Sequence, residues 1–265
     1  MKYFNYFYFL TISIFLFSCS NEQTQNVELK GNAMGTFYFI KLIDVPKKIK
    51  EEKLTLEINK TLLEINKIVS NWDNLSEISV LNSNKTLLPI KISNNLLDVF
   101  KTANFIHIKS NGYFDITLDP IIDLWGFGYK KDKMKKKPPL KEDVLETLLL
   151  VNQKKYLEIN QSNNELVKKN KDVSFNLSAI GKGYGIDLIG KKLRNLKINN
   201  FLINIGGDIL TNGYNSKKQD WVIGIENPNL QQQYIKEIVN VTNKGVATSG
   251  DYKNFFDNDG KKYSH

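Results

Sequence analysis

Three aspartates, Asp115, Asp119 and Asp123, follow one another at steps of four in the run GYFDITLDPIIDLWGFG at residues 112–128. Their neighbours are mostly apolar or aromatic, so the three carboxylates cannot all be solvated surface charges. A buried carboxylate needs hydrogen bonds or counterions, and acids in unusual surroundings gather at functional sites. We therefore expect a ligand pocket in this stretch.

A second candidate site combines glycines with a lysine in the run NLSAIGKGYGID at residues 176–187. The pattern predicts a strand over 173–177, then a glycine-rich turn, and then the start of a helix. Backbone N–H groups and the helix dipole at such a point favour phosphate, and Lys182 adds a positive charge. The GxxxxGK[ST] spacing is absent, which excludes a Walker A loop.

Two shorter motifs offer surfaces for a flat ring. In GNAMGT at 31–36, small residues let a ligand approach the backbone and Met34 offers a soft apolar face, although a plain tight turn explains the pattern equally. In NWDNLSEIS at 71–79, Trp72 can stack on a ring. The alternative is a simple helix end in which Ser76 or Asp73 caps a turn.

Two further motifs lie near the end of the chain. The sequence IGGD at 205–208 follows a strand-like run, and its glycines permit close approach to a ligand. The sequence VATSGDY at 246–252 is followed by YSH at 263–265.

The elements that must position these residues are mixed. Helical spacing of apolar residues predicts a helix over 51–69, and Ser93 can cap another that carries Leu96, Leu97, Phe100 and Ala103. Two more helices are expected over 141–151 and 182–196. Strands are expected over 37–43, 155–159, 165–168, 173–177, 201–205, 221–226 and 234–241. With no internal repeat, the order predicts one α+β domain of mixed sheets flanked by helices.

Composition excludes several classes of protein. The 265 residues carry a formal net charge of +9 and 41% hydrophobic residues, which does not describe a disordered chain. One cysteine excludes an internal disulfide and a multi-thiolate metal cage, and two histidines argue against a histidine-rich zinc site. Arg194 is the only arginine, so nucleic acid is a poor candidate partner. No GxSxG elbow is present, and His107 in an apolar helical stretch is expected to be a packed residue rather than a base.

The amino terminus resembles an export signal. Residues 1–18 have a basic start and an apolar run that ends directly before Cys19, as in a bacterial lipoprotein whose cysteine is lipidated. The polar residues 19–29 are expected to form a tether after the anchor. Between residues 129 and 141, seven lysines accompany one aspartate. This run is interpreted as a solvated loop, with a surface for anionic lipid or an acidic partner as the alternative.

The order and spacing of these motifs resemble the ApbE family, the FAD:protein FMN transferases. The segments AMGT, GYFDITLDPIIDLWGFG, NLSAIGKGYGID, INIGGDI and ATSGDY with YSH correspond to successive family signatures across residues 31–265. Lipoprotein export is common in that family, which agrees with the interpretation of Cys19 as a lipid anchor facing the periplasm.

The resemblance implies that FAD is split at its pyrophosphate. FMN passes to a Thr or Ser hydroxyl of an acceptor protein, such as a membrane redox subunit, and AMP is released with help from Mg²⁺. His265 matches a catalytic histidine near the reaction centre, and Ala179 matches a backbone carbonyl ligand of the metal. The residues expected to contact the flavin nucleotide are Met34, Trp72, Tyr113, Phe114, Asp115, Asn176 and Lys182. For Tyr113 and Phe114, packing in the core is the alternative.

The sequence departs from the family pattern at two points. Asn176 stands where the family commonly has aspartate, so a charge is replaced by a hydrogen-bonding amide. The chain stops at His265, before the late family segment that supplies the remaining metal ligands. We therefore expect an incomplete ApbE-like domain over 30–265 that lacks closing strands and transfers FMN poorly. The alternatives are a flavin-binding lipoprotein without catalysis and a structural lipoprotein without flavin.

Overall fold

The computed structural model describes residues 23–129, 137–228, 234–251 and 254–264. The expected signal peptide 1–18, Cys19, His265 and most of the lysine run lie outside these ranges. The described helices are α1 (Glu51–Val69), α2 (Glu77–Ser83), α3 (Asn94–Lys109), the short 3-10 helix η1 (Ile116–Leu118), α4 (Asp119–Leu124), α5 (Lys141–Leu148), α6 (Gln153–Tyr156) and α7 (Ser178–Asn195). Within the described ranges, no helix has both the length and the apolar character needed to cross a membrane.

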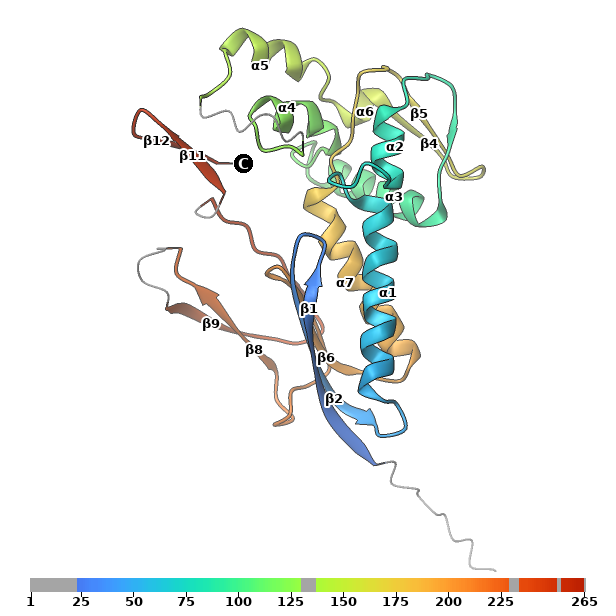
Figure 1. Cartoon of the computed structure of the whole chain (residues 1–265), viewed down its shortest axis with the longest axis vertical. Helices are drawn as coiled ribbons and strands as arrows, with labels where there is room; N and C mark the ends of the chain where they lie inside the picture. Colours follow the sequence, from blue (N-terminus) through green and yellow to red (C-terminus); the bar gives the residue numbers. More distant parts are fainter. Residues whose placement is uncertain (1–22, 130–136, 229–233, 252–253, 265) are drawn as a thin grey trace, which may run out of the picture.

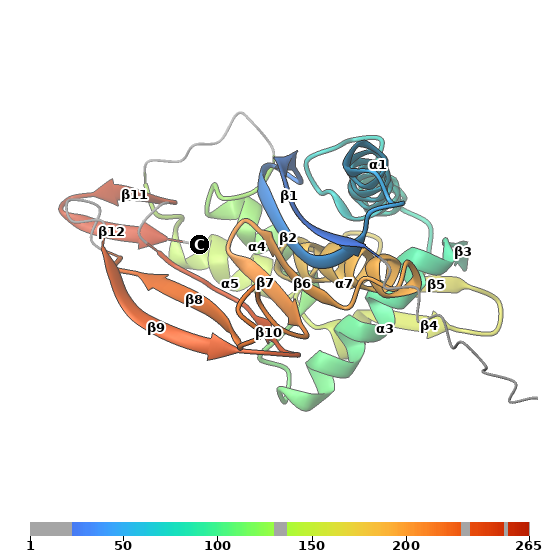
Figure 2. The same ribbon diagram turned by 90° about the horizontal axis from the view of Figure 1, so that it is seen from below.

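The largest sheet has five antiparallel strands, in the order β1 (Thr24–Ala33), β2 (Thr36–Pro46), β6 (Asn200–Ile205), β7 (Asp208–Asn212) and β10 (Gly245–Val246). Figure 2 shows this sheet between α1 and α7 on one side and the hairpin of β8 (Trp221–Glu226) and β9 (Ile235–Val241) on the other. Alternation along β2 explains both contacts. Tyr38, Ile40 and Leu42 enter the core beneath the two helices, whereas Phe39 and Ile43 pack with Trp221.

The expected tether over 19–29 is wrong for its second half. Residues from Thr24 onward form β1, which pairs with β2 over its whole length apart from one bulge. Val27 and Leu29 alternate with polar residues and are each 3% exposed. Polar residues dominate this strand because one of its faces is solvated, and its apolar alternation is too short to predict a strand from the sequence.

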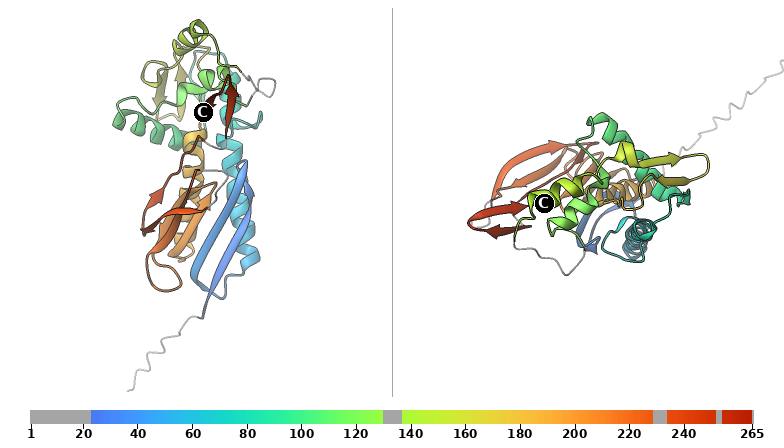
Figure 3. Two further views of the ribbon diagram at one scale, coloured as in Figure 1. Left: turned by 90° about the vertical axis from the view of Figure 1, so that its left-hand side faces the viewer. Right: turned by 90° about the horizontal axis from the view of Figure 1, so that it is seen from above.

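Helices α1 and α7 run side by side from the sheet toward a second group of elements (Figure 1). That group contains α2 to α6 and a three-stranded sheet in the order β3 (Ile90–Lys91), β5 (Glu165–Lys168) and β4 (Leu157–Asn160). Figure 3 shows it gathered at the end of the molecule away from β1 and β2. Phe100 and Phe175 meet edge to face at its centre, with ring centroids 5.1 Å apart. Thus α1 and α7 connect the two cores.

Most of the expected elements are confirmed. Helix α1 has the predicted bounds, and the N–H of Leu96 donates to Oγ of Ser93 at 3.1 Å, which confirms the predicted cap of α3. The strand expected over 173–177 is absent, however. This segment alternates buried and half-buried residues but has an irregular backbone, because Phe175 and Leu177 bond to side chains, as described below. The last hairpin, β11 (Phe255–Asn258) and β12 (Lys261–Ser264), forms a small sheet of its own.

Candidate functional site

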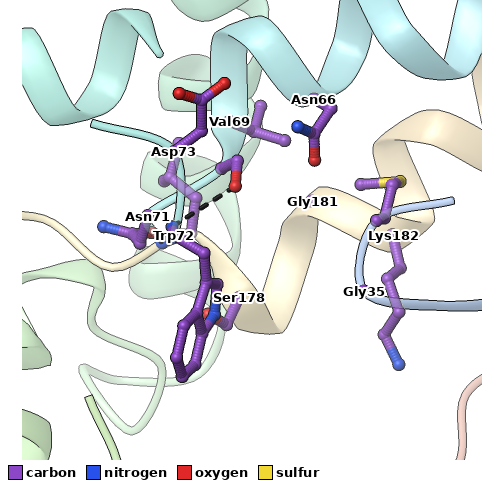
Figure 4. A pocket seen from close by; sticks show the side chains of 12 residues that line it. Gly35, Asn66, Val69, Asn71, Trp72, Asp73, Ser178, Gly181 and Lys182 are labelled. Atoms are coloured by element: carbon purple, nitrogen blue, oxygen red, sulfur yellow. Dashed lines mark hydrogen bonds between the residues drawn. The ribbon is translucent and has the colours of Figure 1, made fainter. Parts of the chain in front are cut away.

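Two neighbouring cavities open where the carboxyl end of α1 meets the amino end of α7. The first has a volume of 670 Å³ and the second 760 Å³. Asn71, Trp72 and Ser178 line both, so they form the boundary between the two spaces. Figure 4 shows the Trp72 ring beside Ser178 at the start of α7, and Lys182 further along the same helix near Gly35. Elements remote in sequence therefore converge on one place.

The hairpin turn between β1 and β2 forms one wall of the first cavity. Met34 and Gly35 are its two central residues, with φ of 53° and 73°, which is the left-handed conformation that a two-residue hairpin turn requires. The turn directs the Met34 side chain onto α7, where a Cβ added to Gly185 would lie 3.3 Å from Sδ. Met34 is thus both part of a tight turn and a lining residue of the cavity.

The glycines of the 176–187 run lie inside a helix, so the expectation of a glycine-rich turn is wrong. Helix α7 begins at Ser178, and both Gly181 and Gly185 are buried. Gly181 faces Val69, whose Cγ2 would be 3.1 Å from an added Cβ, and Gly185 faces Met34 and Ile65. Close packing of α7 against α1 and the hairpin turn needs these small residues, and it outweighs their low helix propensity.

Two buried asparagines hold the segment that leads into α7. The side chain of Asn82 donates to the carbonyl of Phe175 and accepts from its N–H, both at 2.8 Å. Asn71 donates to the same carbonyl at 2.7 Å and accepts from the N–H of Leu177 at 2.9 Å. These bonds replace those of a neighbouring strand. They fix the backbone on either side of Asn176 and the direction in which α7 begins.

Trp72 follows the end of α1 and is 65% exposed. The turn after it is capped in both ways expected from the sequence: Asp73 Oδ1 accepts from the N–H of Leu75 at 2.9 Å, and Ser76 Oγ accepts from the N–H of Ser79 at 3.1 Å. An indole held open between two cavities presents its faces to whatever enters them.

Lys182 lies on the second turn of α7 and forms an ion pair with Asp208, with Nζ 2.9 Å from Oδ2. The two side chains are 31% and 18% exposed. Lys182 lines the first cavity, so a cation stands where the sequence predicted one. Asp208 is the first residue of β7, and its Oδ1 accepts from the N–H of Thr248 at 3.2 Å.

The three aspartates of the 112–128 run are largely buried, as predicted. Asp115 accepts from the N–H of Gln153 at 2.8 Å and from that of Thr117 at 2.7 Å. Asp119 is 1% exposed and accepts from Asn176 at 3.1 Å and from Ser174 at 2.8 Å. The carboxylates of Asp115 and Asp119 therefore accept hydrogen bonds from the protein itself. Among them, Asp119 lies next to a residue of the second cavity, because Asn176 is part of its lining.

Two of the aromatic residues expected at the site lie elsewhere. Tyr113 is 94% exposed in the loop after α3, and Phe114 packs against the hydrophobic core. Neither lines the two cavities. His107 is buried, with Nδ1 2.7 Å from the carbonyl oxygen of Phe114, which confirms that it is a packed residue.

Aromatic rings form the outer wall of the second cavity. Tyr263 of β12 stacks on Phe256 of β11 with centroids 5.2 Å apart, and its ring also lies 6.0 Å from that of Trp125. Phe127 stacks on Phe256 at 5.7 Å. The hairpin thus forms one wall of the cavity through Tyr263, and Ser264, which directly precedes His265 in the sequence, lines its edge.

The arrangement suits a ligand with two ring systems joined by an anionic linker. Each cavity has room for one planar group, and Met34 and Trp72 offer apolar faces. The start of α7 favours negative charge at the boundary, and Lys182 favours it in the first cavity.

Comparison with known proteins identifies the family. The sequence model of the ApbE family matches residues 34–265. The chain belongs to the ApbE family. It is 33% identical over 257 residues to the FAD:protein FMN transferase of Vibrio cholerae, covering 96% of this chain and 74% of that one. It is 32% identical to the enzyme of the same name from Haemophilus influenzae, covering 97% and 74%.

Solved ApbE structures share the fold. The flavin transferase ApbE from Vibrio cholerae superposes with a TM-score of 0.78 at 32% identity, covering 87% of this chain and 73% of that chain. The ApbE protein from Thermotoga maritima gives 0.81 at 26% identity, covering 91% and 75%. The mixed α+β class expected from the sequence is therefore confirmed.

The ApbE resemblance also predicts a Mg²⁺ site that includes the carbonyl of Ala179. Ala179 is exposed in the first turn of α7, where the helical pattern directs its carbonyl toward the N–H of Gly183. The described ranges contain no group of three or more His, Cys, Asp and Glu side chains placed to hold a metal ion. The described residues thus do not form a magnesium site by themselves.

Sequence reasoning missed the residues that hold this ApbE site together. Asn71 lies in the motif at 71–79, where its residue type alone indicates no role, and Asn82 lies outside the motifs. One signal was present: Asn82 follows Ile78 at a helical step of four, so a polar side chain lies on the buried face of α2. A buried amide must find partners, and here they are backbone groups.

Proposed function

We propose that this chain transfers the FMN half of FAD to a Thr or Ser hydroxyl of an acceptor protein and releases AMP. The relatives named above are FAD:protein FMN transferases. The observation that carries the proposal is the meeting of two ring-sized cavities at Trp72 and Ser178, with Lys182 close by. FAD has the matching shape, because its flavin and adenine rings are joined by a diphosphate.

The transfer is a displacement at phosphorus. The acceptor oxygen forms a bond to the phosphorus of the FMN half, and the bond from that phosphorus to the bridging oxygen breaks. AMP leaves with the bridging oxygen, and the hydroxyl proton passes to a base. Lys182 stabilises the negative charge on the phosphoryl oxygens, and the cavities align the reacting atoms. His265 is proposed as the group that handles the proton, since it directly follows Ser264 at the cavity edge.

Mg²⁺ is proposed as the ion that neutralises the diphosphate, with the Ala179 carbonyl as one ligand, on the ApbE resemblance. The described residues do not complete a site for this ion. Flavin transfer measured against Mg²⁺ concentration, with a chelator as the control, tests this part separately. A rate that is unchanged by chelation contradicts it.

Export and lipidation at Cys19 are proposed from the sequence. If Cys19 is acylated, only residues 20–23 separate the anchor from β1, and they span about 14 Å when extended. The cavities lie at the far end of α1, which is about 28 Å long. The acceptor would be a membrane redox subunit, or another exported protein, whose hydroxyl reaches that height. Loss of radiolabelled palmitate in Cys19→Ala tests the anchor.

The activity is tested with purified chain, FAD, Mg²⁺ and a synthetic peptide that contains one threonine. Flavin attached to the peptide together with an equal amount of AMP supports the proposal, and a peptide with alanine in place of threonine is the control. Tightly bound flavin without AMP contradicts transfer and supports a flavin-binding protein instead. A chain that binds no flavin contradicts both functions and supports a structural lipoprotein.

A further inference from the structure

Asp208 joins two segments that are far apart in the sequence. Its Oδ2 pairs with Nζ of Lys182 on α7 at 2.9 Å, and its Oδ1 accepts from the backbone N–H of Thr248 at 3.2 Å. Each carboxylate oxygen thus has a partner within the protein, and the side chain is only 18% exposed. One carboxylate therefore links the cation of the first cavity to the segment that leads to β11 and β12.

The turn before β7 fixes where this carboxylate lies. Gly206 and Gly207 have φ of 57° and 96° and connect β6 to β7 so that Ile205 pairs with Asp208. The N–H of Gly207 donates to Asn204 Oδ1 at 2.9 Å, which holds the turn from inside. Asp208 is thus presented by a rigid two-residue turn rather than by a loose loop.

Thr248 closes onto the same turn. Oγ1 of Thr248 donates to the carbonyl of Gly207 at 3.1 Å. A Cβ added to Gly207 would lie only 2.6 Å from the same Oγ1. Glycine is required there for both φ and space. The segment that starts at Thr248 is consequently attached to the sheet through Gly207 and Asp208 together.

We propose that Asp208 is a positioning residue for flavin transfer: it holds the Lys182 ammonium in the orientation that meets the reacting phosphoryl group. This inference rests on the function proposed above. An ammonium has three donors, and Asp208 takes one of them, so two remain for phosphoryl oxygens. Without Asp208, the long lysine side chain would have to be ordered as the phosphoryl group transfers, at a cost in side-chain conformational entropy.

The negative charge of Asp208 distinguishes a role in positioning Lys182 from a role in binding FAD directly. A carboxylate close to a diphosphate repels it, so Asp208 cannot increase FAD affinity by direct attraction. Its contribution is orientation, which is expressed when the phosphoryl group transfers rather than when FAD binds. Replacing Asp208 by asparagine should therefore lower the rate of transfer more than it weakens binding.

The first experiment compares Asp208→Asn and Asp208→Glu with wild type. For D208N we expect a fall of about ten-fold or more in kcat, with the Kd for FAD, from quenching of flavin fluorescence, changing less than about three-fold. D208E, which keeps the carboxylate, should recover part of the rate. Asp220→Asn, an exposed aspartate before β8, is the matched control and should leave both quantities unchanged.

The second experiment needs no flavin. The rate at which an amine-reactive acylating reagent labels Lys182, read by peptide mass spectrometry, reports whether Asp208 holds the ammonium. We expect several-fold faster labelling of Lys182 in D208N, with the exposed Lys217 unchanged as an internal reference. Equal labelling in wild type and D208N overturns the proposed pairing.

The outcomes separate the two proposals. Wild type that binds no FAD contradicts the proposed function, and the role of Asp208 in transfer falls with it. Wild type that transfers FMN while D208N does so equally fast overturns the positioning role alone. Parallel losses in kcat and in FAD affinity, without recovery in D208E, also overturn it, because they indicate a general structural defect.

Discussion

Asn82 binds Phe175 through both of its amide atoms, with Oδ1 and Nδ2 each 2.8 Å from a backbone group of that residue. One side chain on α2 thus makes the two hydrogen bonds that a neighbouring β-strand would otherwise make with Phe175. Asn82 is 7% exposed and Phe175 is 0% exposed, so water cannot replace these bonds without opening the core. The entry to α7, and with it the boundary between the two cavities, depends on this pair.

Asn82→Leu should destabilise the protein by about 1–3 kcal/mol, because the N–H of Phe175 loses its acceptor in a dry environment. The carbonyl keeps its bond from Asn71, so the loss stays below that of two orphaned groups. Urea unfolding measures the change. Asn240→Leu on the exposed face of β9 is the control and should change the free energy of unfolding by about 0.5 kcal/mol or less. Equal stability of both variants would contradict the role of Asn82.

The parts of the fold that could be predicted are those in which local pattern and environment agree. Helix α1 has one apolar stripe and a solvated face, and its bounds were predicted correctly. The 173–177 segment has the composition of a buried strand, but its Phe175 and Leu177 bond to side chains that are remote in sequence. No local pattern records such partners. In β1, the solvated face hid an alternation of only two buried residues.

The candidate site shows the same division. Met34, Trp72, Asn176 and Lys182 line the cavities as their motifs suggested, because a turn or a helix end places each of them. Asp115 was expected there from its burial and from the ApbE resemblance, yet its carboxylate accepts from Gln153 and Thr117. Burial predicts that a partner exists, and only the tertiary structure shows whether the partner is a ligand or the chain itself.

Replacement of two glycines of α7 by alanine should affect the stability of the protein differently. Gly183 has nothing within 4 Å of an added Cβ, so Gly183→Ala should raise helix propensity and stabilise the protein by about 0.5–1 kcal/mol. Gly185→Ala places a methyl group 3.3 Å from Sδ of Met34 and should displace it. We expect no gain in stability and weaker FAD binding for G185A. Thermal unfolding measures the stability and flavin fluorescence the FAD affinity. A stabilised G185A with unchanged FAD affinity would contradict the assignment of Met34 to the FAD site.

Trp72→Ala should weaken FAD binding by about ten-fold, since a stacked aromatic face contributes about 0.5–1.5 kcal/mol beyond the area it covers. Trp72→Phe keeps an aromatic face and should retain most of the affinity. Leu75→Ala is the control, because Leu75 is 88% exposed in the same turn and lines neither cavity. Since Trp72 is itself largely exposed, all three variants should unfold at nearly the same urea concentration. If W72A bound FAD like wild type, the ligand would lie elsewhere.

Lys168 introduces a pH dependence of stability. Its side chain is 0% exposed, and Nζ donates to the carbonyls of Leu81 and Asn84 at the end of α2. Burial lowers the pKa of this lysine below the ordinary value of 10.5, and the nearby Lys85 lowers it further. Between the folded pKa and 10.5 the unfolded chain therefore binds more protons than the folded chain.

The free energy of unfolding should consequently rise with pH across that interval, because the penalty for burying the ammonium is lost as the proton leaves. Below the folded pKa the penalty is fully present. Urea midpoints from neutral pH to about pH 10 test this for wild type, Lys168→Met and the exposed control Lys171→Met. The wild-type midpoint should improve relative to K168M as pH increases, whereas wild type and K171M should stay parallel. If all three curves ran in parallel, Lys168 would keep its proton at alkaline pH, and its burial would not control the stability of the α2 end.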